Sequence, residues 1–108
     1  MSSNKVAVIG MAGVFPGAEN VADLWSMLIS GKSGIRSFTE DELAPEARAL
    51  KRNHGERYVA SKGYLNNAYE FDHTFFGMSK KDAQLLDPQQ RHFLQVCWNA
   101  FHDAGYSP

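Results

Sequence analysis

Residues 5–17, KVAVIGMAGVFPG, decide the fold class of this chain. They include the unbroken apolar run 6–9, which is rich in β-branched residues and closed by glycine. Such a run is typical of a strand buried on both faces, as in a parallel sheet flanked by helices. A helix is expected next, because Asn20 can cap it, apolar residues recur on one stripe over 21–29, and Gly31 can end it. Strand, glycine loop and helix together predict an α/β fold.

A second strong helix signal lies near the end of the sequence. Asp87 has the short acceptor side chain of an N-cap, Pro88 suits the first helical position, and Gln90 occupies the reciprocal capping-box position. Arg91 follows and is expected to pair with a carboxylate or a backbone carbonyl. The pattern predicts a buried or half-buried packing helix that ends at Gly105. Its apolar stripe consists of Phe93, Leu94, Cys97, Trp98, Phe101 and Ala104.

Shorter elements are expected between these two regions. They are a short turn of helix at the capping-box spacing TEDE (39–42), a helix over about 46–53 after Pro45, a short strand around 58–60, a single turn capped by Asp72 that carries Phe71, Phe75 and Phe76, and a short helix from Ser79 to about Leu86. Three phenylalanines so close together need a large apolar surface to pack against.

The composition indicates a soluble globular chain of one domain at most. It has 108 residues, a formal net charge of -1 and 44% apolar residues. Because Lys and Arg are scattered singly, neither nucleic acid nor an anionic membrane is expected as a partner. The single cysteine, Cys97, excludes an internal disulfide, and no apolar run is long enough for a signal peptide or a membrane span. A cytoplasmic protein is expected.

Glycines after the predicted strand raise the possibility of a nucleotide site. They are Gly10, Gly13 and Gly17. The spacing is G-x-x-G-x-x-x-G rather than G-x-G-x-x-G, and Pro16 stands where a helix should already begin, so a structural turn is favoured. GKS at 31–33 resembles the end of a phosphate loop, but Ser26 replaces the required first glycine and the tripeptide ends a helix.

Neither the cysteine nor the histidines form a recognisable site. His92 and His102 each lie five residues from Cys97, about 500° around a helix, which turns both rings away from the thiol. A cysteine on an apolar stripe is expected to be a small core residue. His54 and His73 have no partner at metal-ligand spacing. No catalytic, cofactor or metal site is therefore predicted from these residues.

Three motifs resemble the beginning of the β-ketoacyl synthase (ketosynthase) domain of modular type I polyketide synthases. They are I-G-M-A-x-x-F-P-G at 9–17, F-F-G-M-S at 75–79 and D-P-Q-Q-R at 87–91, in the family's order and spacing. Val14 departs from the pattern where many members have arginine, and this affects a surface or loop contact. Residues 39–57 fall where such domains vary in length and sequence.

The resemblance implies the N-terminal portion of a thiolase-like α-β-α-β-α fold, incomplete in residues 1–108, with the remainder of the domain after residue 108. It implies a homodimeric parent that catalyses decarboxylative Claisen condensation of acyl and malonyl-type thioesters held on the phosphopantetheine arm of acyl carrier proteins. The family's nucleophile lies in a later segment of the D-T-A-C-S-S type, and its histidines and lysine come later still. No catalytic residue is therefore carried over to this chain, and Cys97 does not fit that position.

Two other interpretations are open at this level. A truncated, catalytically silent ketosynthase could act as a docking module for a carrier protein or synthase partner. An independent nucleotide-binding domain would have to bind a dinucleotide. The leading interpretation is that these residues supply scaffold for a ketosynthase, are inactive alone and are not a stable monomer, because a strand apolar on both faces needs neighbours that this sequence lacks.

Overall fold

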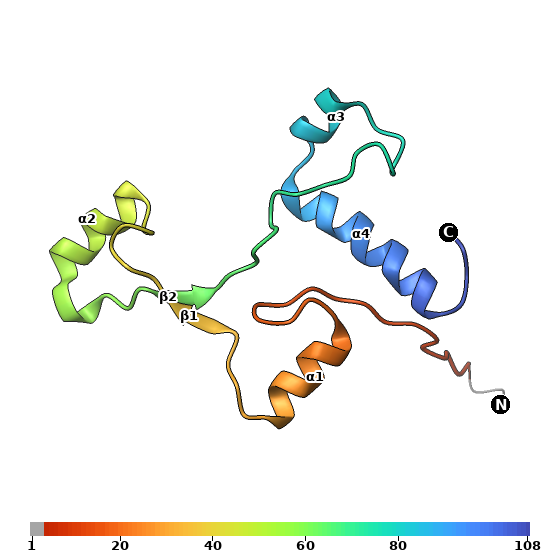
Figure 1. Cartoon of the computed structure of the whole chain (residues 1–108), viewed down its shortest axis with the longest axis horizontal. Helices are drawn as coiled ribbons and strands as arrows, with labels where there is room; N and C mark the ends of the chain where they lie inside the picture. Colours follow the sequence, from red (N-terminus) through yellow and green to blue (C-terminus); the bar gives the residue numbers. More distant parts are fainter. Residues whose placement is uncertain (1–3) are drawn as a thin grey trace. The chain divides into compact units, whose positions relative to one another are not determined.

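The computed structural model describes residues 4–108, which divide into two compact units (Figure 1). One unit is Phe15–Leu65, and the other consists of the residues up to Val14 together with Asn66–Pro108. Within the described residues, no helix has the length and apolar character needed to cross a bilayer.

Helix α1, Val21–Ile29, lies in the Phe15–Leu65 unit and has the predicted boundaries. The Asn20 side chain accepts a hydrogen bond from the Asp23 backbone N–H at 2.8 Å and donates one to the Asp23 carboxylate at 2.8 Å. These bonds satisfy a backbone donor that the first turn leaves unpaired. Gly31, with φ of 69°, follows the last turn, in the left-handed region that glycine adopts without a steric penalty.

The same unit contains a two-stranded antiparallel ribbon. Strand β1, Ile35–Ser37, pairs with β2, Ser61–Gly63, and Phe38 extends the pairing by donating its backbone N–H to Ala60 at 2.8 Å. The strand predicted around residues 58–60 therefore begins three residues later. The physical reason is that Tyr58 still closes the preceding 3₁₀ turn, through a 3.1 Å backbone bond.

Pro16 explains two of the glycines in this unit. A Cβ at Gly34 would collide with the carbonyl group of Pro16, and a Cβ at Gly63 would lie 2.7 Å from the Pro16 ring. Pro16 belongs to a tight turn in which Phe15 and Ala18 exchange backbone hydrogen bonds of 2.8 and 3.0 Å. The expectation that the glycine-rich stretch forms a structural turn is thus confirmed at residues 15–18.

Between β1 and β2 the chain makes an excursion that contains helix α2, Pro45–His54, and the 3₁₀ helix η1, Gly55–Arg57. The helix predicted over 46–53 is confirmed to within one residue at each end. Pro45 occupies its first turn, where the missing N–H removes no intrahelical bond.

The second unit contains α3, Lys80–Leu85, and α4, Pro88–Asp103. Ser79 caps α3, and the Asp87 carboxylate caps α4 by accepting the Gln89 N–H at 2.8 Å. Both caps confirm the predicted helix starts. No reciprocal bond from the Gln90 side chain to this cap is found in the described part of the chain, so that half of the capping box is not formed. Gly105 ends α4 as predicted, with φ of 81°.

The phenylalanine cluster packs against α4. The Asp72 carboxylate caps the predicted single turn by accepting the Phe75 N–H at 3.0 Å. Phe71 and Phe76 stack with ring centroids 5.1 Å apart, while Phe75 meets the Trp98 ring edge-on at 5.3 Å. The large apolar surface that the three phenylalanines require is therefore provided in part by Trp98.

The strand predicted over residues 6–9 is absent. These residues carry no strand pairing, and Val6 and Val8 are 92% and 82% exposed. The sequence pattern describes a strand with neighbours on both edges, and within residues 4–108 no segment pairs with it. An apolar strand without hydrogen-bonding partners has no ladder to hold it, so the segment stays irregular.

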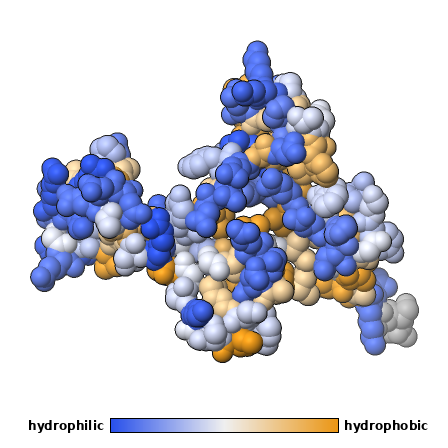
Figure 2. All heavy atoms as spheres, in the orientation of Figure 1, coloured by the Kyte–Doolittle hydropathy of each residue, from blue (hydrophilic) through white to orange (hydrophobic). Residues whose placement is uncertain are grey.

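Few apolar residues are buried. Among the described residues the buried ones are Ala18, Phe38 and Ala83. The stripe of α4 is half-buried at best, with Phe93 and Phe101 69% and 55% exposed. Figure 2 shows apolar side chains open to the surface on the face drawn.

Candidate functional site

Two of the glycines that follow residue 9 have structural roles in this chain. Gly10 illustrates this, because a Cβ there would lie 2.5 Å from the Ala100 carbonyl oxygen and 2.8 Å from the Ala104 Cβ. Gly10 thus permits close packing against the last turns of α4. Gly17, with φ of 80°, serves the turn at residues 15–18. These contacts account for two of the glycines without a nucleotide.

The GKS tripeptide is likewise structural. Gly31 ends α1, and Lys32 donates its backbone N–H to Met27 at 3.0 Å. The Ser33 hydroxyl accepts the Ile35 N–H at 3.1 Å, just before β1. The segment therefore closes a helix and leads into a strand, which is opposite to the strand-to-helix order of a phosphate loop.

Cys97 is a free, half-buried thiol on α4. The two histidines nearest to it in the sequence, His92 and His102, contact other groups. One nitrogen of the His92 ring lies 2.9 Å from the Ala68 carbonyl oxygen, and the His102 ring stacks on Trp98 at 5.4 Å. The prediction that neither ring serves the thiol agrees with these contacts.

The remaining histidines have ordinary surroundings. Nδ1 of His73 lies 2.9 Å from the Met78 carbonyl oxygen and closes the loop before α3. His54 is exposed at the end of α2. Over residues 4–108, no three His, Cys, Asp or Glu side chains lie together in a way that could hold a metal ion.

Arg91 lies on the first turns of α4 and reaches back along its own unit. Its guanidinium Nη1 is 3.5 Å from the Tyr69 carbonyl oxygen, so the expected carbonyl partner is present at the limit of a hydrogen bond. Its Nε atom is shielded from solvent and has no hydrogen-bond partner. A guanidinium held this loosely retains donor capacity for another acceptor.

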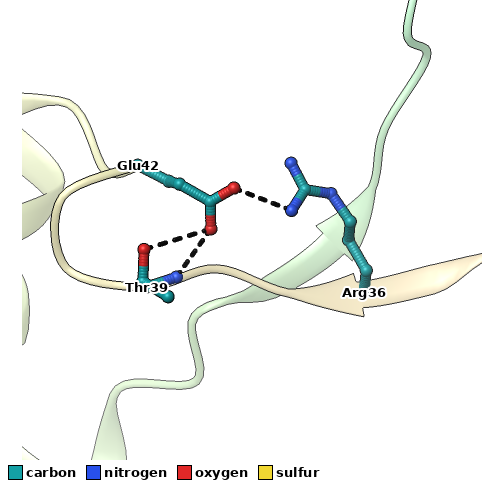
Figure 3. Close-up of polar contacts among 3 residues, drawn as sticks. All are labelled: Arg36, Thr39 and Glu42. Atoms are coloured by element: carbon teal, nitrogen blue, oxygen red, sulfur yellow. Dashed lines mark hydrogen bonds and ion pairs between the residues drawn. The ribbon is translucent and has the colours of Figure 1, made fainter.

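One polar cluster on the β1–β2 ribbon is fully assembled (Figure 3). The Glu42 carboxylate accepts the Thr39 N–H at 2.8 Å and the Thr39 hydroxyl at 3.2 Å, which is the Glu half of a capping box. The Glu42 N–H bonds to the Thr39 backbone carbonyl instead of its side chain, and residues 40–43 form a turn where a turn of helix was expected. The other oxygen of the Glu42 carboxylate receives a 2.9 Å hydrogen bond from Arg36. The pKa of Glu42 is lowered, mainly by the backbone bond from Thr39 and then by Arg36.

Arg36 is the member of this cluster that the sequence pattern did not reveal. Its guanidinium carbon lies 4.2 Å from the centre of the Phe38 ring and 4.8 Å from that of Tyr64. The Glu42 carboxylate and the two rings hold the Arg36 side chain in place, which orders the chain where it leaves β1. A pairing six residues apart across a strand and a turn has no local periodicity by which it could be found. The cluster contains no nucleophile or general base in a cleft, so its role is structural.

Comparison with known proteins identifies the class to which this scaffold belongs. Residues 3–108 match the family profile described as "Beta-ketoacyl synthase, N-terminal domain". The chain belongs to the β-ketoacyl synthase family, as its three motifs predicted.

Named relatives narrow the class to polyketide synthases. A phenolphthiocerol/phthiocerol polyketide synthase from Mycobacterium tuberculosis is 45% identical over 105 residues, which cover 97% of this chain and 7% of that protein. Polyketide synthase PksM from Bacillus subtilis is 36% identical over 104 residues, covering 95% and 2%. The chain thus spans less than a tenth of the length of these relatives.

Solved structures give the fold of the complete domain. The ketosynthase from module 6 of the bacillaene synthase of Bacillus subtilis superposes with a TM-score of 0.76 at 35% identity, over 94% of this chain and 17% of that one. Ketosynthase twelve from the bacillaene synthase of Bacillus amyloliquefaciens gives 0.79 at 36%, over 93% and 18%. The predicted fold class, an N-terminal portion of the thiolase-like fold, is confirmed.

Proposed function

We propose that this chain is the opening scaffold of a polyketide synthase ketosynthase that catalyses decarboxylative Claisen condensation. In this reaction a cysteine accepts an acyl group from the phosphopantetheine arm of an acyl carrier protein. A carrier-bound malonyl-type unit then loses CO₂, and the resulting carbanion attacks the acyl thioester. We also propose that the parent protein is a homodimer, that it acts with an acyl carrier protein and that it is cytoplasmic.

This proposal is supported by the family match together with the contacts of the histidines near Cys97. The match covers residues 3–108. Within the described residues, the two histidines nearest to Cys97 in the sequence contact other groups, His92 the Ala68 carbonyl and His102 the Trp98 ring. An activated thiolate needs a lowered pKa or an adjacent base. We therefore propose that the nucleophile and the catalytic histidines lie in polypeptide outside these residues, and that the segment alone is inactive and binds no cofactor.

A cysteine substitution in the intact parent synthase tests this placement. Cys97→Ala should retain acyl-enzyme formation, measured by mass spectrometry after incubation with an acyl thioester. It should lower stability by about 1 kcal/mol, as for a small truncation at a half-buried site. Cys97→Ser, which keeps the size but weakens the nucleophile, is the matched control and should load equally well. Loss of acyl loading in a Cys97→Ala variant that is still folded would place the nucleophile at this residue and refute the proposal.

The docking-module interpretation is less well supported. The relatives that match nearly the whole chain are named as polyketide synthases, and the structural neighbours as ketosynthases. None of the described contacts favours a separate adaptor role over a scaffold role.

A further inference from the structure

We draw no further inference here: the strongest candidate, the surface patch on the β1–β2 ribbon where Lys62 lies opposite Arg36, carries nothing, because the contacts of these two side chains are to Glu42 and to aromatic rings of the same unit, and nothing in the structure shows what covers the patch.

Discussion

The 108-residue chain by itself should not unfold cooperatively as a monomer. The perturbation is separation from the rest of a ketosynthase. The loss of stability that it causes can be estimated from the surface area that the chain leaves exposed. A folded monomer of 12.0 kDa is expected to expose about 6,000 Å². This chain exposes 8876 Å², an excess of about 2,900 Å² over that expectation.

The missing burial is large compared with the stability of a small domain. If roughly 57% of the excess is apolar, about 1,600 Å² of apolar surface stays in water, which corresponds to about 40 kcal/mol of hydrophobic stabilisation. Burying a further area of about 1,500 Å², the upper size of an interface between domains, would still leave a shortfall of about 20 kcal/mol. Net stabilities of domains are only about 5–15 kcal/mol.

Circular dichroism and calorimetry check this prediction. The far-ultraviolet signal should show helix, because α1, α3 and α4 carry their own caps, and it should decline gradually on heating. The near-ultraviolet signal of Trp25 and Trp98 should be weak, and a dye that binds apolar surfaces should bind at low temperature. A single sharp heat-absorption peak from a chain of monomeric mass would refute the reasoning.

Three further predictions concern single residues. Gly10→Ala in an intact ketosynthase that contains this chain should lower the unfolding free energy by about 1–3 kcal/mol, because the new methyl group meets the Ala100 carbonyl; a denaturant midpoint unchanged from the parent would contradict that close packing. Asp87→Ala in the same protein should lower it by about 1 kcal/mol and Asp87→Asn by less, since the amide oxygen can still accept; equal losses would rule out the cap as the cause. The pKa of Glu42 is lowered, so the carboxylate should titrate below pH 4.5 when the Thr39 amide is followed by nitrogen-15 NMR over a pH series. Its contribution to the stability of this turn is complete above that pH and is lost as the pH falls through the lowered pKa. Glu42→Gln should abolish the pH dependence, and a midpoint at or above 4.5 would contradict the prediction.

Helix boundaries could be predicted because their causes lie within a few residues. Asn20, Ser79 and Asp87 each cap the helix that their spacing predicts, and Gly31 and Gly105 end theirs with positive φ. A cap depends on one side chain and a donor two or three residues away. Such information is complete in a short stretch of sequence, whatever surrounds it.

Pairings between distant residues could not be predicted in the same way. The β1–β2 ribbon joins residues about 26 apart, and each strand is only three residues long, too short for an alternating pattern. Its fit depends on Pro16, which lies close to Gly34 and Gly63. The register of such a ribbon is set by contacts between segments, so sequence alone placed the second strand three residues too early.

The absence of the strand predicted at residues 6–9 has a different cause. Its sequence pattern is typical of a strand buried on both faces, but such a strand forms only when other strands supply hydrogen bonds and other elements cover its side chains. The apolar side chains of Val6 and Val8 therefore suit a buried environment that residues 4–108 do not provide. The helix caps and the anchored Gly10 show that local structure is already in place in this chain. What this chain lacks is burial, and we propose that this burial comes from the same polypeptide that brings the catalytic cysteine.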